Sequence, residues 1–288
     1  MGLMGQFFAT DLNPAQSAAC QISDQAFEAP RVTDPGYPDF LKKLVKAYKI
    51  DLIIPTIDPE LPILAGLKAE FAEERGWVLV PDSAHCKAWN SKRETEKWFV
   101  ERGLKTPRIY PDLGEIVFPC FAKLEASSCS KGAQVVQSRS QAEALLAHDP
   151  SYIFQELLEG EEYTVDLYIS RQTKTLVSAV NRKRLEVRAG EVSKGITEKN
   201  TTVTQCIERF AKSCDTEGVL TVQVMRHQGE IYFIEVNPRF GGGYPLSYQA
   251  GANFARYIAN DWLGIPNPPY KDWQDGLLML RYDAEIFV

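Results

Sequence analysis

The chain has 288 residues, 44% of them hydrophobic, and a net charge of −6 at pH 7. This length allows a substantial core in one large or two medium domains. The negative charge argues against a broad nucleic-acid or membrane-surface footprint, and no apolar run is long enough to span a bilayer. The six cysteines are scattered without a Cys-x-x-Cys pair, which argues against structural zinc and favours reduced thiols of a cytoplasmic protein.

Residues 1–82 show apolar strand patterns, at residues 6–10, 51–55 and 77–81, that alternate with helical patterns. Such alternation predicts a parallel sheet. The segment lacks the Gly-x-Gly-x-x-Gly turn of a dinucleotide-binding unit, so we interpret Asp11, at a strand end, as structural. The pattern also starts on what reads as a second strand, and we expect a first strand and helix to be missing.

A helix is predicted over residues 90–103, with Asn90 or Ser91 as its N-cap. Lys92 lies in the first turn, where a cation opposes the helix dipole. A phosphate partner would explain it, and a solvated lysine is the alternative.

A second lysine, Lys123, lies inside an apolar strand over residues 117–125, where a cation is costly unless paired. The Ser-rich loop that follows ends near Gly132 and can fold its N–H groups over phosphates, although it is not the Walker pattern. Lys123 is therefore a better phosphate candidate than Lys131 in the loop. A plain hairpin connection remains open.

Residues 152–169 read as two strands joined by an acidic turn. An extended segment there can present backbone groups to an adenine edge, and Glu162 can accept from ribose hydroxyls. The next stretch, residues 181–195, is rich in basic side chains. It is either a solvated edge strand or a region that attracts a nucleotide or anionic substrate. These basic residues are Arg182, Lys183, Arg184, Arg188 and Lys194.

Two apolar runs flank a polar turn at residues 228–229 and predict a β-hairpin. Glu235 and Asn237 are two residues apart and share one face, and strand pairing can bring Gln223 to it. Mg²⁺ prefers such oxygen ligands. Arg239 is two residues beyond Asn237, so its side chain is expected on the same face. Its guanidinium cation suits a phosphoryl group that is being transferred.

Three glycines at residues 241–243 then allow the backbone to approach a ligand closely. The alternative for the whole segment is a surface hairpin with a solvated polar face. A closing helix is expected over residues 249–263, and a final strand near residues 277–282.

Taken in order, these segments resemble the ATP-grasp superfamily. The resemblance rests on the helix lysine, the strand lysine before a Ser/Gly loop, the Gln-Glu-Leu-Leu-Glu-Gly-Glu-Glu hinge and the Gln plus Glu-x-Asn-Pro-Arg hairpin. It covers nearly the whole chain and is closest to one synthetase half of the carbamoyl-phosphate synthase large subunit. It implies an α/β (α+β) fold class: a partial Rossmann-like parallel-sheet domain over residues 1–82 precedes an ATP-grasp domain over residues 83–288, whose two subdomains enclose ATP.

The resemblance implies roles by position. The lysines would hold ATP phosphates under a lid at residues 127–132, the backbone of residues 156–158 would bind adenine, and Glu162 the ribose. The implied ATP ligands are Lys92, Lys123, Ser128, Gly132, Gln155, Glu156, Leu157, Leu158 and Glu162. The implied Mg²⁺ ligands, with Mn²⁺ as a substitute, are Gln223, Glu235 and Asn237. Arg239 and, with a looser match, Lys194 would act on the acyl phosphate.

Two departures narrow the expected function. The chain corresponds to one synthetase half rather than two, and the glycine run replaces serine-rich residues. The Arg-x-Gly-Glu-x-x-x-Gly run at residues 188–195 is similar to that of free-standing ligases that join a carboxylate to an amine. We therefore expect a cytoplasmic ADP-forming ligase of small-molecule carboxylates and amines, with no nucleic-acid or membrane partner and with a homodimer left open. The alternatives are carbamoyl-phosphate synthase-like activity, ATP binding without catalysis, and an oxidoreductase that uses the N-terminal unit.

Overall fold

The computed structural model describes residues 5–126, 132–188 and 190–288. It divides into two compact units: one comprises the chain up to Leu79 together with Tyr282–Val288, and the other is Val80–Arg281. Within the described ranges, no helix has both the length and the apolar composition that crossing a bilayer requires.

The N-terminal unit contains two separate sheets of two parallel strands each. β1 pairs with β2, and β3 pairs with β4. The parallel pairing agrees with the prediction from sequence, but the expected buried strand at residues 51–55 is shorter and more exposed, since Ile54 keeps 42% of its surface accessible. In chain order the elements are β1 (Phe8–Asp11), the 3-10 turn Pro14–Gln16, α1 (Ala18–Gln21), β2 (Gln25–Glu28), α2 (Tyr37–Tyr48), β3 (Leu52–Ile53), the 3-10 turn Asp58–Glu60, α3 (Leu61–Glu73) and β4 (Trp77–Val78).

Helix α2 shows how this unit forms its small core. Tyr37, Leu41 and Val45 recur every four residues and are buried together on one face. The helix ends at Lys49, which adopts a left-handed conformation and closes the last turn through its N–H to the carbonyl of Val45.

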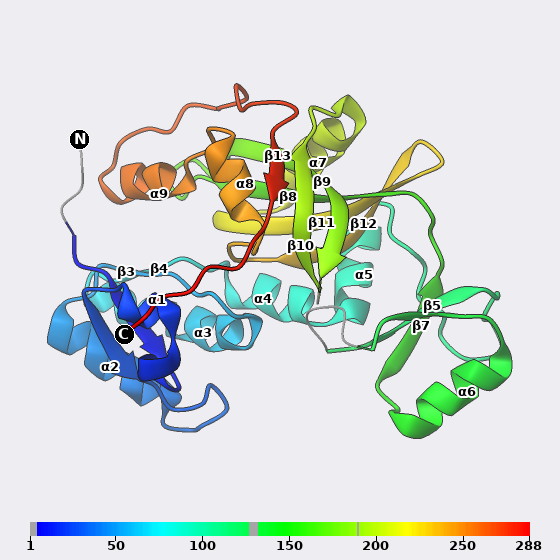
Figure 1. Ribbon diagram of the computed structural model, residues 1–288, viewed down its shortest axis with the longest axis horizontal. Coiled ribbons are helices and arrows are strands. Elements are labelled where there is room, and N and C mark those ends of the chain that lie inside the picture. The colour runs from blue at the N-terminus through cyan, green and yellow to red at the C-terminus, as the bar shows by residue number, and fades with distance from the viewer. Residues whose placement is uncertain (1–4, 127–131, 189) are drawn as a thin grey trace. The chain divides into compact units, whose positions relative to one another are not determined.

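The C-terminal unit holds a six-stranded and a three-stranded sheet (Figure 1). The larger sheet has the strand order β12-β11-β8-β9-β10-β13, with every neighbour antiparallel, and the smaller has the order β6-β5-β7. β7 and β8 are consecutive in the chain but belong to different sheets, so the acidic turn between them links the two sheets. The elements are α4 (Ser83–Asn90), α5 (Lys92–Glu101), β5 (Cys120–Leu124), β6 (Gln134–Val136), α6 (Arg139–His148), β7 (Tyr152–Glu156), β8 (Glu161–Ile169), β9 (Leu176–Arg188), β10 (Glu191–Thr197), α7 (Thr201–Ser213), β11 (Gly218–His227), β12 (Glu230–Asn237), α8 (Tyr244–Gln249), α9 (Phe254–Trp262) and β13 (Leu278–Leu280).

The two faces of the large sheet differ in chemistry. On one face, alternate residues of β8 and β11, such as Leu167 and Val222, join a core with side chains of α4, α5 and α7, including Phe99 and Phe210. The opposite face carries the polar residues of the alternation and is contacted by α8. This polar face is therefore the one on which a site can be built.

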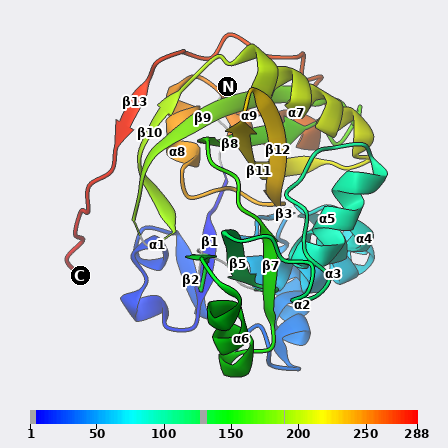
Figure 2. The ribbon, with the colours of Figure 1, turned by 90° about the vertical axis from the view of Figure 1, so that its right-hand side faces the viewer.

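The small sheet has its own core. Cys120 and Ala122 of β5 and Val136 of β6 pack with Ala142 of α6, and all four are fully buried. Figure 2 shows α6 beside β5 and β7. A compact lobe of this kind gives β5 a stable base from which to present Lys123.

The closing helix predicted over residues 249–263 is present as α9, but it starts later, at Phe254, and a separate short helix, α8, ends at Gln249. The break lies between them at Gly251, whose φ of +107° is outside the range of a helix. Asn253 then caps α9 by accepting a hydrogen bond from the N–H of Arg256.

Candidate functional site

The β11–β12 hairpin places the three predicted metal ligands on the polar face. Gln228 and Gly229 both have positive φ, as a tight two-residue hairpin turn requires. Gln223 lies directly opposite Glu235 in the register, and Asn237 is the next residue of β12 on the same side. The sequence predicted that these three side chains share one face, and the pairing of β11 with β12 places them there.

The chemistry of these side chains fits Mg²⁺. They offer one carboxylate and two amide oxygens, which are hard ligands of the kind that Mg²⁺ prefers. In the part of the chain that the structure describes, there is no group of three His, Cys, Asp or Glu side chains that could hold a metal alone. A cation at this hairpin would therefore depend on further oxygens, such as those of a phosphate chain.

Lys123, on β5, lies in the same electrostatic environment. Desolvation by burial lowers the pKa of its ammonium to about 8, the Glu235 carboxylate opposes this shift, and the Lys92 ammonium adds to it. The effects of Glu235 and Lys92 require these charges to lie near Lys123, whereas desolvation reflects its burial alone. Lys92 of α5 and Glu235 of β12 thus both lie near Lys123 of β5.

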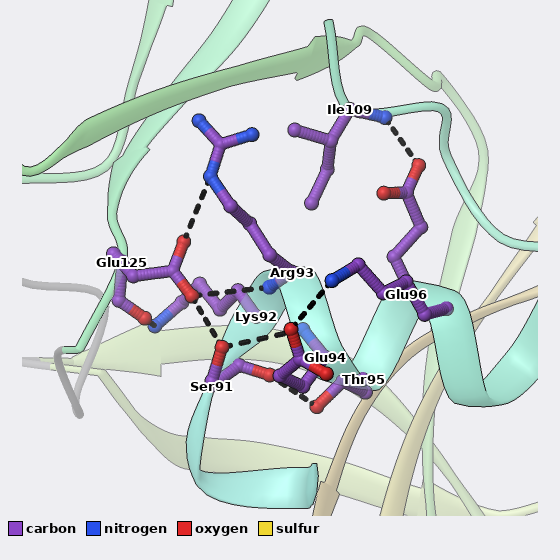
Figure 3. Close-up of polar contacts among 9 residues, drawn as sticks. Ser91, Lys92, Arg93, Glu94, Thr95, Glu96, Ile109 and Glu125 are labelled. Atoms are coloured by element: carbon purple, nitrogen blue, oxygen red, sulfur yellow. Dashed lines mark hydrogen bonds and ion pairs between the residues drawn. The ribbon is translucent and has the colours of Figure 1, made fainter. Parts of the chain in front are cut away.

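Glu125 fixes the start of α5 to the end of β5 (Figure 3). Its Oε1 accepts hydrogen bonds from Ser91 Oγ at 2.6 Å and Arg93 N at 3.1 Å, and its Oε2 lies 3.6 Å from Arg93 Nε. Lys92 Nζ donates to the Glu125 carbonyl oxygen at 3.3 Å. Ser91 is the N-cap, and Glu125, two residues beyond Lys123, bonds Lys92 to the end of the strand that carries Lys123.

The predicted adenine and ribose residues lie where β7 leads into β8. Gln155 is buried within the small sheet, and the N–H of Glu156 donates to the carbonyl of Arg108 at 2.9 Å. Leu157 and Leu158 connect the two sheets, and Leu158 is buried. The Glu162 carboxylate accepts a hydrogen bond from Arg184, so a ribose at Glu162 would share this carboxylate with the guanidinium.

Gly132 is the only predicted lid ligand among the described residues, since Ser128 lies outside them. Gly132 has a φ of +72°, and a Cβ at this position would lie 2.8 Å from Tyr152 Oη. Glycine is therefore required there by both conformation and space.

The two residues predicted to act on the acyl phosphate are placed differently. Arg239 is half-buried just after β12, where its carbonyl accepts from Thr221 Oγ1 at 2.9 Å and its Nη1 donates to the Phe240 carbonyl at 3.0 Å. Lys194 is half exposed and forms an ion pair with Glu186 at 2.7 Å. Both roles stay predictions, and the Lys194 ammonium already has a carboxylate partner in Glu186.

A buried ion pair beside the metal ligands was missed by sequence reasoning. Asp166 accepts from Arg182 Nε at 2.7 Å and Nη2 at 3.0 Å, and both side chains are almost completely buried. Ser247 Oγ also donates to Asp166, and Thr221 Oγ1, whose shorter hydrogen bond goes to the Arg239 carbonyl at 2.9 Å, lies 3.4 Å from Asp166 Oδ1. The signal was an aspartate inside the apolar strand Thr-Val-Asp-Leu-Tyr, since a carboxylate in that setting needs partners.

The glycine run at residues 241–243 packs against this network. A Cβ on Gly241 would lie 2.8 Å from Thr221 Cγ2, and Cβ atoms on the next two glycines would come closer still to Glu191 and Arg182. The close approach that the sequence indicated is thus made to the chain's own side chains, two of which, Thr221 and Arg182, are hydrogen-bonded to Asp166.

The basic run on β9 is neutralised by acidic partners. Lys183 bonds to Glu161, and Arg184 to Glu162, in addition to the buried pair of Arg182. The alternative of a solvated edge strand is wrong for Arg182 and Lys183, which pair with both β8 and β10, whereas residues 184–188 pair with β10 alone and residues 185–188 are exposed.

Two family models match parts of the chain. Residues 148–283 match a model described as ATP-grasp in the biosynthetic pathway with Ter operon, and residues 2–79 match the N-terminal domain of PylC-like proteins. No curated protein matches the sequence.

Solved structures resemble the chain in fold at low identity. The biotin carboxylase domain of the Hydrogenobacter thermophilus 2-oxoglutarate carboxylase, solved with MgADP, ADP and bicarbonate, has a TM-score of 0.77 at 12% identity, over 95% of this chain and 68% of that one. Biotin carboxylase from Campylobacter jejuni has a TM-score of 0.72 at 12% identity, over 94% and 68%. L-amino acid ligase from Bacillus licheniformis has a TM-score of 0.65 at 16% identity, over 83% and 63%.

Proposed function

Because the chain belongs to the ATP-grasp superfamily, we propose that it is an ATP- and Mg²⁺-dependent ligase that activates a carboxylate for attack by an amine. The observation that supports this most directly is the electrostatic coupling of Lys123 with Glu235 and Lys92, which come from three different elements. Two cations and an oxygen-rich hairpin around one centre suit a triphosphate with its metal.

The reaction has two steps. An oxygen of the substrate carboxylate attacks the γ-phosphorus of ATP, the bond to the β–γ bridging oxygen breaks, and ADP leaves. The amine then attacks the acyl carbon, phosphate leaves, and the amine loses a proton as the amide forms. Neither step needs a covalent enzyme intermediate, so the protein positions the reactants and stabilises charge.

Each side chain then has a defined task. Lys92 and Lys123 bind phosphate oxygens, and Glu125 keeps the two lysines beside each other. Gln223, Glu235 and Asn237 would hold Mg²⁺, which when bound neutralises charge on the β- and γ-phosphates. Mn²⁺ has the same preference for oxygen ligands and is proposed as a substitute.

Arg239 is proposed to stabilise the charge that develops on the transferred phosphoryl group. Its carbonyl is tied to Thr221, and Thr221 is tied to the buried Asp166. The backbone of Arg239 is therefore held by a rigid network, which is the preorganisation that transition-state stabilisation needs.

Release of ADP and phosphate from ATP tests the proposal. We would screen pairs of amino acids, and bicarbonate as a carboxylate, with Mg²⁺ present. Lys123→Met should abolish release, whereas the matched change Lys97→Met, in an exposed ion pair on α5, should leave it intact. Turnover that survives simultaneous Glu235→Ala and Asn237→Ala would rule out the assignment.

Three narrower points belong to the same proposal. A cytoplasmic location is supported by the described cysteines, all of which are free thiols. A homodimer is the oligomeric state to test first by sedimentation, because dimers with twofold symmetry are the commonest assemblies. The narrower resemblance to carbamoyl-phosphate synthase stays a prediction. It is tested by whether bicarbonate supports the release of ADP and phosphate in the screen.

A further inference from the structure

The glycine run at residues 241–243 leads from the β11–β12 hairpin to the start of β10. A Cβ on Gly241 would lie 2.8 Å from Thr221 Cγ2, and Thr221 is directly opposite Asn237 in the register of the hairpin. A Cβ on Gly242 would lie 2.2 Å from Oε2 of Glu191, the first residue of β10. The backbone of Gly242 therefore lies directly against the Glu191 carboxylate.

Glu191 is also near Arg239, which is proposed to act on the transferred phosphoryl group. Gly242 follows Arg239 by three residues, and a chain of that length spans at most about 11 Å. The Arg239 carbonyl accepts a hydrogen bond from Thr221, the same side chain that Gly241 approaches, so the segment between them stays close to β11. A carboxylate beside Gly242 can therefore reach a small substrate that is bound at Arg239.

Glu191 differs from neighbouring carboxylates in its lack of a cationic partner. Carboxylates on β8 and β9 are neutralised by ion pairs, which are Glu161–Lys183, Glu162–Arg184, Asp166–Arg182 and Glu186–Lys194. Within residues 5–126, 132–188 and 190–288, the Glu191 side chain makes neither an ion pair nor a hydrogen bond. The residue is only partly exposed, and a partly buried carboxylate is stabilised by a cation that binds to it.

Arg281 lies at the same glycine but is engaged with backbone groups. Its Nη2 donates to the Gly242 carbonyl, and its N–H donates to the Ser193 carbonyl of β10 at 2.9 Å. Arg281 thus joins the glycine run to β10. The guanidinium is used for a carbonyl, and the charge of Glu191 is left for a cation from outside the chain.

We propose that Glu191 binds an ammonium group of the carboxylate substrate, so that this substrate is an amino acid and not a simple carboxylate or bicarbonate. The inference rests on the proposed ligase function. The carboxylate of the amino acid is phosphorylated beside Arg239, and its ammonium group, which does not react in this step, pairs with Glu191. A charge-assisted hydrogen bond of this kind orients the substrate as well as binding it.

Hydroxylamine allows the test to be made without knowledge of the natural amine. It attacks an acyl phosphate and gives a hydroxamate, so hydroxamate formed with ATP and Mg²⁺ reports the first step for any carboxylate. Each amino acid is compared with the deaminated acid of the same length, such as alanine with propanoate and 4-aminobutanoate with butanoate. The unmodified chain should show at least about a tenfold higher kcat/KM for the preferred amino acid than for its deaminated counterpart, because only the amino acid pairs with Glu191.

Two variants remove the pairing in different ways. Glu191→Gln removes the charge and should raise KM for the amino acid by about 10–100-fold, with little change in kcat or in KM for the deaminated acid. Gly242→Ala keeps the charge, but its Cβ must displace the Glu191 carboxylate, so it should act in the same direction. Glu208→Gln on α7, the helix that packs on the apolar face of the sheet, is the matched control and should leave both acids unaffected.

The outcomes separate this assignment from the ligase function on which it rests. Absence of hydroxamate from every carboxylate would refute the ligase function itself. Hydroxamate formed equally well from amino and deaminated acids, or an unchanged KM in Glu191→Gln, would overturn the ammonium site alone. An equal rise in KM for both acids would also overturn it, because a purely structural role of Glu191 affects both acids alike.

Discussion

β8 in the C-terminal unit has a hydrogen-bonded neighbour on each side, whereas every described strand of the N-terminal unit has a neighbour on one side only. From its third residue to its last, β8 is buried, while no residue of β1 is. Both strands contain apolar residues, so composition does not explain the difference. β8 has a partner at each edge and helices packed against its apolar face, whereas β1 has a partner at one edge only.

The largest expected effect concerns the buried pair of the C-terminal unit. Asp166→Ala should lower the free energy of unfolding by about 3–5 kcal/mol, because it leaves the Arg182 guanidinium buried without its counterion. The matched control is Glu186→Ala, which removes the half-exposed pair with Lys194 and should cost at most about 1 kcal/mol. Urea denaturation measures both. Similar losses for the two variants would show that the polar face is more hydrated than its burial indicates.

Truncation of one leucine in each unit sharpens the comparison. Leu167 of β8 is fully buried, and Leu167→Ala should cost about 2–5 kcal/mol. Leu52 of β3 is only half-buried, so Leu52→Ala should cost clearly less. Urea denaturation, monitored by amide hydrogen exchange in each unit, measures the loss of stability caused by each variant separately. A Leu52→Ala loss as large as that of Leu167→Ala would contradict the contrast in packing.

Arg239→Ala tests whether the chemistry belongs to the C-terminal unit. We expect kcat for ADP release to fall about 10²–10³-fold, since one preorganised donor to the transition state is lost. The melting temperature should change little. Arg139→Ala on α6 removes a solvent-exposed arginine of the same unit and serves as the control. A loss confined to KM would instead indicate a role in binding ATP.

A smaller effect is expected from pH at Lys123. Burial lowers the pKa of its ammonium to about 8, so the group is charged below this pH and neutral above it. ATP affinity should therefore weaken as pH rises through 8, by up to about tenfold per pH unit. Lys123→Arg stays charged over this range, and its pH profile should be flatter. Titration of ATP binding from pH 7 to pH 9.5 measures the difference, and identical profiles would remove Lys123 from the phosphate site.

Much of the site was predictable because its signals are local. The hairpin of β11 and β12 and the shared face of Glu235 and Asn237 follow from strand alternation and a turn that contains glycine. The Ser91 cap follows from side-chain chemistry at a helix start. The ATP-grasp family, inferred from the order of several weak motifs, is confirmed over residues 148–283, which match an ATP-grasp family model.

Other features of the site arise from contacts between distant segments. Glu125 reaches Ser91, and Asp166 reaches Ser247, across long stretches of chain. The spacing of residues along one strand does not indicate which side chain from a distant segment will contact that strand. The glycine run shows this well, since the sequence indicated a close approach but not that Arg182 would be the neighbour.

By itself, the sequence determined the hairpin of β11 and β12, its polar face and the presence of a lysine in an apolar strand, because alternation and turn chemistry act over a few residues. Only the tertiary structure decided that this lysine lies beside Lys92 and Glu235 and that the basic run on β9 is neutralised. Strand neighbours, ion partners and desolvation are set by residues that meet only when the chain has folded.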